Sequence, residues 1–205
     1  MKVITLNMSK VKVLIEGYAK KTKEGWLASS STTLIEDGGK KIIVDPGINR
    51  ELLFRKLKDQ GLTPNGIDIV FMTHYHPDHM FLTSVFEKAM VVDGDTVYEK
   101  DNETGYEGRV PGTSLEVILT PGHAHEHAAL LATTERGKIV VAADVFWWTD
   151  EEKQQTDNVK ALVNKEDPFT KDREALKASR RKVLEIADWI IPGHGKMFRN
   201  PKKKG

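Results

Sequence analysis

The chain has 205 residues, a formal net charge of +1 and no cysteine. This length suits one domain with a sizeable core, and the balanced charge gives no global reason to expect a nucleic-acid or membrane surface as partner. The lack of cysteine excludes disulfides and thiolate metal ligands. No run reaches the roughly 18 apolar residues of a membrane span, and residues 1–7 do not resemble a signal peptide. We therefore expect a cytoplasmic protein.

The sequence pattern of the first third of the chain predicts a few strands that include a hairpin, followed by a helix. Strands are expected over residues 11–16, 31–35 and 41–44, with a polar loop between the first two. The Asp-Gly-Gly turn within residues 36–40 supplies the positive φ of a tight hairpin. Residues 49–60 place leucines near helical spacing and stop at Gly61, which predicts a helix.

The rest of the chain alternates apolar runs with charged segments. Strands are expected over residues 67–72, 89–92, 114–119, 128–133, 139–143 and 187–191. Helices are expected over residues 81–88 and 170–187 and from a capping box at residues 149–152. Residues 94–112 predict irregular structure or short edge strands. Because no linker or repeat divides the chain, we expect one domain over residues 1–205, with its core at about 11–198 and a short basic tail.

One short motif carries the strongest chemical signal. His74, His76, Asp78 and His79 follow the buried strand at residues 67–72 in an H-x-H-x-D-H pattern. Imidazole nitrogens and carboxylate oxygens are the metal ligands available to a chain without cysteine. Such a cluster arises by chance in very few chains of this composition, so the motif predicts a metal site.

The same kind of residue recurs where other strands end. Asp45, His123, Asp144 and His194 each follow an apolar run, and His123 and His194 stand in Pro-Gly-His turns. Strand ends at one edge of a sheet form a natural crevice for a site. Glycine lets the backbone approach closely there. The repetition favours a role as ligands or orienting groups for the whole set.

In the order and spacing of these motifs, the chain resembles the metallo-β-lactamase superfamily. Residues 166–168, 179–184, 187–188 and 192–195 also resemble the branch named metallo-β-lactamase domain-containing protein 1. The resemblance implies an α/β (α+β) fold, a four-layer αββα sandwich with the metal centre along the sheet edges.

Carried over by position, the resemblance implies two metal sites. His74, His76 and His123 would hold one ion, and Asp78, His79 and His194 the other. Asp144 would bridge them, and Asp78 and Asp144 would be the catalytic carboxylates. Seven nitrogen and oxygen ligands exceed one four-coordinate ion and suit two divalent ions, with Zn²⁺ expected and Fe or Mn as alternatives.

Further positions are expected around these ligands. Asp45 and His127 match places where such groups orient metal-bound imidazoles; alternatively, Asp45 caps a turn and His127 is exposed. Tyr75, His125, Trp147 and Trp148 are expected substrate contacts. The alternatives are core positions for the aromatics and a surface position for His125.

The expected activity is hydrolysis by a metal-bridged hydroxide of an ester, thioester, lactone or phosphodiester. A small-molecule substrate is expected. RNA stays open as a partner, and with it an endoribonuclease, because the named branch has been associated with RNA cleavage. A mononuclear Fe(II) sulfur dioxygenase, using His74, His123 and Asp144, is the main alternative. A catalytically idle binding module is the third, and the oligomeric state is open.

Overall fold

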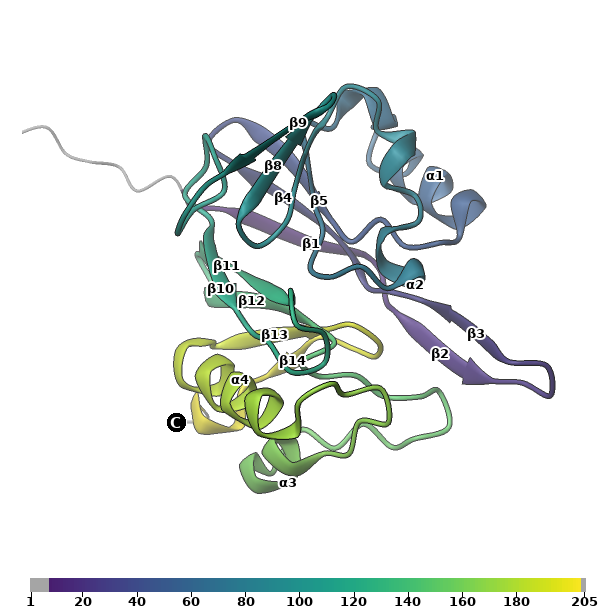
Figure 1. The fold of residues 1–205 in the computed structure, drawn as a ribbon, viewed down its shortest axis with the longest axis vertical. Coiled ribbons are helices and arrows are strands. Elements are labelled where there is room, and N and C mark those ends of the chain that lie inside the picture. Colours follow the sequence, from purple (N-terminus) through teal and green to yellow (C-terminus); the bar gives the residue numbers. More distant parts are fainter. Residues whose placement is uncertain (1–7, 204–205) are drawn as a thin grey trace, which may run out of the picture.

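The computed structural model describes residues 8–203. Residues 1–7, for which no signal peptide was expected, and the last two residues of the basic tail lie outside this range. Two sheets pack face to face, with α1 (Arg50–Lys58) outside one sheet and α3 (Val159–Asn164) and α4 (Arg173–Ile186) outside the other (Figure 1). This arrangement confirms the expected αββα sandwich.

The first sheet has seven strands in the order β1-β4-β5-β6-β7-β8-β9. Its strands are β1 (Lys10–Ile15), β4 (Thr32–Asp37), β5 (Lys40–Val44), β6 (Ile69–Phe71), β7 (Met90–Val92), β8 (Thr96–Glu99) and β9 (Asn102–Gly105). The three central strands β5, β6 and β7 are parallel, and the outer pairs are antiparallel.

The second sheet has five strands in the order β10-β11-β12-β13-β14. Its strands are β10 (Glu116–Leu119), β11 (Ala128–Thr134), β12 (Gly137–Ala143), β13 (Trp189–Pro192) and β14 (Phe198–Arg199). Only β12 and β13 pair in parallel among these five.

Three apolar clusters hold the layers together. The central cluster joins the inner faces of both sheets, with Ile42 and Phe71 from the first and Leu130 and Val141 from the second. The other two clusters join each sheet to its outer helices. Burial of both faces explains why the central strands read as continuous apolar runs.

The parallel pairs determine where the site lies. Val44 and Phe71 are register partners at the ends of β5 and β6, and Ala143 and Pro192 are partners at the ends of β12 and β13. Since parallel strands end at the same edge, the residues that follow each pair emerge side by side.

Two predicted helices are wrong. Residues 81–88 contain only the 3₁₀ turn η2 (Thr83–Val85), where the Thr83 hydroxyl donates to the Met80 carbonyl at 2.7 Å. The capping-box bond from Thr149 N–H to Glu152 forms at 2.8 Å. No helix follows it before α3, because Asp150 exchanges backbone and side-chain bonds with Ala19.

Several elements were not predicted. Residues 17–30 form a two-stranded hairpin, β2 (Tyr18–Lys21) and β3 (Trp26–Ser29), which projects from the side of the sandwich (Figure 1). Neither strand alternates apolar with polar residues, since β2 reads Tyr-Ala-Lys-Lys and β3 reads Trp-Leu-Ala-Ser. The short α3, β14, and the 3₁₀ turns η1 (Pro64–Gly66) and η3 (Pro201–Lys203) were also missed, as was the four-residue helix α2 (Pro77–Met80). Within residues 8–203, no helix has both the length and the apolarity needed to cross a membrane.

Candidate metal centre

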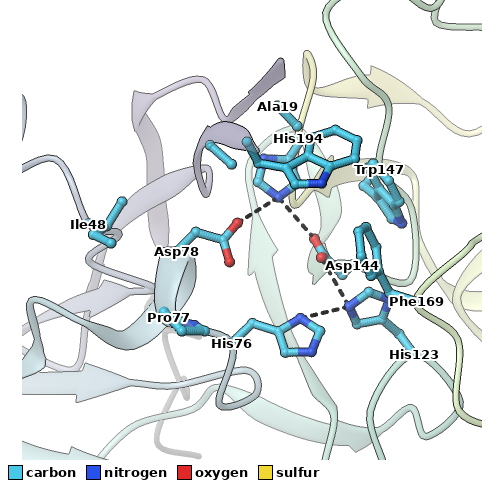
Figure 2. Close-up of a pocket in the computed structure, with 12 residues that line it drawn as sticks. Ala19, Ile48, His76, Pro77, Asp78, His123, Asp144, Trp147, Phe169 and His194 are labelled. Atoms are coloured by element: carbon cyan, nitrogen blue, oxygen red, sulfur yellow. Dashed lines mark hydrogen bonds and ion pairs between the residues drawn. The ribbon is translucent and has the colours of Figure 1, made fainter. Parts of the chain in front are cut away.

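The seven predicted ligands meet at the common strand-end edge. Their donor atoms fall into two groups, and within each group the atoms lie no more than 4.8 Å from one another. Five of the seven residues line one pocket (Figure 2). The first group is His74, His76, His123 and Asp144, and the second is Asp78, His79 and His194. These are the two sets that the resemblance implied, with Asp144 among the first set.

Asp144 lies between the two groups. Its Oδ2 is 3.2 Å from His123 Nε2 and 3.9 Å from His74 Nε2. Its Oδ1 is 3.2 Å from His79 Nε2 and 3.7 Å from His194 Nε2. One carboxylate therefore presents one oxygen to each group, which is the geometry of a bridging ligand.

The remaining donors, His76 and Asp78, join the first and the second donor group respectively. His76 Nδ1 lies 3.0 Å from His123 Nε2, and Asp78 Oδ2 lies 3.2 Å from His194 Nε2 (Figure 2). Proline at the first position of α2 fixes the turn that separates His76 from Asp78. This turn sends the two side chains to different groups.

Hydrogen bonds at the other ring nitrogen orient four of the imidazoles. Nδ1 of His79 contacts Asp45 at 2.8 Å, and Nδ1 of His123 contacts Asp167 at 2.7 Å. Nδ1 of His194 contacts the Tyr18 carbonyl at 3.0 Å, and Nδ1 of His74 contacts the Thr73 hydroxyl at 3.0 Å. Each bond places the proton on Nδ1 and leaves Nε2 as a lone pair, as a metal ligand requires.

The unpaired donor atoms fit metal ions. His74 Nε2, His79 Nε2 and Asp144 Oδ1 are buried and have no hydrogen-bond partner among the described residues. Buried polar atoms without partners are costly. Nitrogen and oxygen donors at this spacing suit a first-row divalent cation.

The electrostatics of the pair Asp144 and His79 point the same way. Burial alone would raise the pKa of Asp144, yet the imidazoles of His79 and His194 hold it well below its usual value. Burial would lower the pKa of His79, but Asp144 and Asp45 raise it well above its usual value. Asp144 and His79 thus shift each other's pKa toward the charged form. A divalent cation bound to the same donors would supply the positive charge instead and leave His79 Nε2 as a lone pair.

Backbone strain and close packing mark the segments around Asp45 and Asp144. Asp45 and Ala143 are two of the three described non-glycine residues with positive φ, at +49° and +42°. A Cβ on Gly193 would lie 1.7 Å from Asp144 Oδ1. Only glycine therefore allows the chain just after β13 to pass so close to Asp144, which explains the glycine before His194.

Asp45 and His127 differ in how they meet the imidazoles. Asp45 accepts bonds from His79, from Thr73 N–H at 2.9 Å and from the Thr73 hydroxyl at 2.7 Å. His127 is buried rather than exposed, with its ring stacked on His74 at a centroid distance of 4.9 Å. Its Nδ1 contacts the Thr120 hydroxyl at 2.9 Å. It supports His74 by packing, and burial together with His123 lowers its pKa to about 3.

Of the four expected substrate contacts, one lines the pocket. Trp147 lies in its wall, whereas Trp148 packs against Phe198 in the core. Tyr75 turns away because its hydroxyl donates to Asp93, and His125 lies with it in a separate cavity. Trp148, Tyr75 and His125 therefore lie outside the lining of this pocket, and their role as substrate contacts stays a prediction.

Sequence reasoning missed four residues of the site. Asp167 orients His123, the Tyr18 carbonyl orients His194, and Trp26 and Phe169 line the pocket. Asp167 stands in the 166–168 run that carries the branch resemblance, and this was its available signal.

Sequence comparisons place the chain among known proteins. A family model described as "Metallo-beta-lactamase superfamily" matches residues 25–117. The metallo-beta-lactamase domain-containing protein 1 of Xenopus laevis is 34% identical over 200 residues, covering 92% of this chain and 81% of that protein. The mouse protein of the same name is 33% identical, covering 85% of this chain and 72% of that protein.

Solved structures agree on the fold. A metallo-beta-lactamase family protein of Thermus thermophilus superposes with a TM-score of 0.64 at 19% identity, covering 95% of this chain and 76% of that chain. A dizinc quorum-quenching lactonase in complex with a product superposes with a TM-score of 0.59 at 14% identity, covering 83% of this chain and 74% of that chain. By sequence and by fold, the chain belongs to the metallo-β-lactamase superfamily.

Proposed function

We propose that the chain is a dinuclear metal-dependent hydrolase of a small-molecule ester, thioester, lactone or phosphodiester. The family and the histidine and aspartate cluster support a metal-dependent hydrolase in general. The observation that carries the dinuclear proposal is Asp144, whose two oxygens face one donor group each. Zn²⁺ suits the nitrogen-rich donor set, and Fe or Mn are the alternatives.

Two bound divalent cations would lower the pKa of a shared water and polarise the substrate oxygen. The chain's own groups hold the centre in place. Asp144 aligns the two groups, and Asp45 and Asp167 fix the rings of His79 and His123. Fixed donors need no reorganisation during the reaction.

Asp78 is the candidate for proton transfer. Its side chain is 26% exposed and lines the pocket, whereas that of Asp144 is 6% exposed. His194 lies 3.2 Å from Asp78 and lowers its pKa against the opposing effect of burial. The carboxylate is thus charged at neutral pH and open on the side where a substrate enters, so it can accept a proton there, as a weak base because its pKa is lowered.

Three features support two ions rather than one. The second group holds three donors of its own, Asp78, His79 and His194, which a mononuclear triad would leave without a role. Hydrogen bonds to Asp45 and to the Tyr18 carbonyl orient the rings of His79 and His194, just as other hydrogen bonds orient rings of the first group. A lactonase of this fold is described as dizinc.

Metal analysis with a substrate panel tests the proposal. The purified protein, loaded with zinc, iron or manganese in turn, should hold about two ions per chain. It should hydrolyse at least one of a simple ester, thioester, lactone and phosphodiester. Binding of a single ion at saturation would contradict the dinuclear proposal. Failure on every substrate with two ions bound would contradict the hydrolase proposal.

A further inference from the structure

The pocket beside the donor groups has an apolar wall. Its volume is about 370 Å³, at the lower end of the range for small-ligand pockets. The residues that complete it, beyond the metal donors, are Ala19, Trp26, Ala28, Ile48, Pro77, Trp147 and Phe169. Lysine and arginine are absent from this lining, as far as residues 8–203 are concerned.

Three aromatic rings form a continuous surface that leads to the donors. Trp26 meets Phe169 edge-on at a centroid distance of 5.9 Å, and Phe169 meets Trp147 at 5.8 Å. Trp147 in turn lies 6.1 Å from the His194 ring. A group resting on this surface would have its neighbouring atoms at the metal centre.

The outer part of this surface is exposed. Trp26 is 46% exposed, Phe169 43% and Ile48 39%, and all three line the pocket. Figure 2 shows Ile48 on one side of the donors and Trp147 with Phe169 on the other. Exposed apolar side chains gathered around one cavity indicate a binding site, whereas scattered ones need no explanation.

Two independent parts of the fold build the wall. Trp26 comes from the β2–β3 hairpin, whose register places Trp26 opposite Lys21 and Leu27 opposite Lys20. Successive residues of a strand face opposite sides, so Leu27 faces away from the pocket side of Trp26. Phe169 is placed by Asp167, which accepts its backbone N–H at 2.9 Å and also orients His123.

We infer that the substrate carries an apolar, uncharged acyl group, aliphatic or aromatic, that rests on Trp26, Phe169 and Ile48 while its ester, thioester or lactone carbonyl lies at the metal centre. This inference rests on the proposed hydrolase function and narrows its substrate class. An apolar group gains by leaving water for this wall. A polyanion such as RNA, or an acyl group ending in a carboxylate, would find no lysine or arginine among the lining residues described.

The reaction balances without a further reactant. Water oxygen adds to the carbonyl carbon, the bond from that carbon to the leaving oxygen or sulfur breaks, and the leaving atom takes a proton. The products are a carboxylic acid and an alcohol or thiol. At about 30 Å³ per water molecule, the cavity of about 370 Å³ has the volume of on the order of a dozen waters, which is room enough for a six- to eight-carbon acyl group.

The test compares esters of one alcohol on the zinc-loaded full chain. We expect kcat/KM to be about tenfold or more higher for p-nitrophenyl hexanoate than for the acetate or the hemisuccinate. Trp26→Ala should lower kcat/KM for the hexanoate about tenfold and change the acetate by less than twofold. Leu27→Ala, the matched control on the opposite side of the hairpin, should leave both unchanged.

Two results would overturn the inference. One is faster turnover of the hemisuccinate, or of an RNA oligonucleotide, than of the hexanoate. The other is an equal effect of Trp26→Ala on all esters, or an effect matched by Leu27→Ala.

A binding measurement separates this inference from the hydrolase proposal. If the metal-loaded protein cleaves none of the esters, calorimetry with hexanoate and succinate tests the apolar wall alone. Hexanoate binding that weakens about tenfold in Trp26→Ala and not in Leu27→Ala supports the wall even though hydrolysis has failed. Equal or tighter binding of succinate overturns it.

Discussion

Asp45 Oδ2 lies 2.8 Å from Nδ1 of His79, at the point where two parallel strands end side by side. The backbone of Asp45 has φ +49°, and its carboxylate also accepts two bonds from Thr73, the residue before His74. One strained residue at the end of β5 thus orients a donor of the second group directly. Through Thr73 it also orients a donor of the first group.

Replacing Asp45 with Asn should weaken metal binding without unfolding the protein. The amide oxygen can still accept the Thr73 N–H, but the amide nitrogen would face two donors, the Thr73 hydroxyl and His79 Nδ1. Orienting groups of this kind contribute roughly 10–100-fold to metal affinity or activity. Zinc titration against a competing chelator measures the loss. An unchanged titration and an unchanged rate would reduce Asp45 to a turn residue.

Removal of metal should destabilise the chain. Without ions, the buried His74, His79 and Asp144 retain donor atoms with no partner in the described part of the chain. Metal that binds only the folded state stabilises it by mass action, by about 2.7 kcal/mol at 100 times the dissociation constant. We expect a chelator to lower the melting temperature by several degrees and zinc to restore it. An identical melting curve with and without chelator would contradict this coupling.

The strand ends were predictable because each donor follows an apolar run long enough to read as a strand. The parallel pairing of β5 with β6 and of β12 with β13 then brings Asp45, His74, Asp144 and His194 to one edge. The orienting groups were harder to predict. His194 is oriented by the backbone carbonyl of Tyr18, and because every residue has such a carbonyl, the sequence cannot identify it.

Substrate contacts were the hardest residues to predict, because they depend on the direction in which each side chain points. Tyr75 stands between two donors in the sequence, yet its hydroxyl donates to Asp93 and takes the ring away from the pocket. Trp147 and Trp148 are neighbours, yet one faces the pocket and the other the core. Phe169 reaches the site from the segment between α3 and α4, where no periodic pattern predicts a direction.

Arg180 on α4 should be essential for stability. The residue is 2% exposed, and its guanidinium donates to the carbonyls of Val145, at 2.9 Å, Val163, at 3.3 Å, and Lys165. Burial lowers its pKa to about 10, so it stays charged at neutral pH. Arg180→Met would leave the carbonyls of Val145 and Val163 without this donor, and we expect the free energy of unfolding in urea to fall by roughly 2–4 kcal/mol.

The neighbouring Arg181 provides the matched control for this substitution. It is exposed on the same helix, and Arg181→Met should change the free energy of unfolding by less than about 0.5 kcal/mol. Equal losses in the free energy of unfolding would show that Arg180 has no special role in joining α4 to Val145, the residue after Asp144.

Asp93 should contribute a pH-dependent part of the stability. Burial would raise its pKa, but hydrogen bonds from Tyr75 and Tyr98 hold it below its usual value. A carboxyl whose folded pKa is depressed stabilises the fold above its unfolded pKa of about 3.9, and this contribution is lost as pH falls through the folded pKa. Asp93→Asn should therefore lower stability at pH 7 and flatten its decline below about pH 4. Parallel curves for the two proteins in urea unfolding from pH 7 to pH 2.5 would contradict this.

Replacement of His194 distinguishes the hydrolase from the mononuclear Fe(II) dioxygenase. Both activities need His74, His123 and Asp144, so replacing these residues cannot discriminate. His194 lies in the second group, where its Nε2 is 3.2 Å from Asp78 and 3.7 Å from Asp144. A dinuclear hydrolase needs it to hold the second ion, whereas a two-His, one-Asp iron site does not.

His194→Ala should therefore lose one metal ion per chain and lower hydrolysis by about 100-fold or more, while the ion of the first group stays bound. Loss of the ring leaves only Asp78, His79 and the shared Asp144 for the second ion, and it removes the contact of Trp147 with that ring. Elemental analysis, ester and phosphodiester hydrolysis, and oxygen uptake with a persulfide substrate are measured on both proteins. We expect no oxygen uptake in either. Oxygen consumption by the iron-loaded wild type that survives in His194→Ala would replace the hydrolase with the dioxygenase, because only a mononuclear centre can lose this histidine and keep its activity.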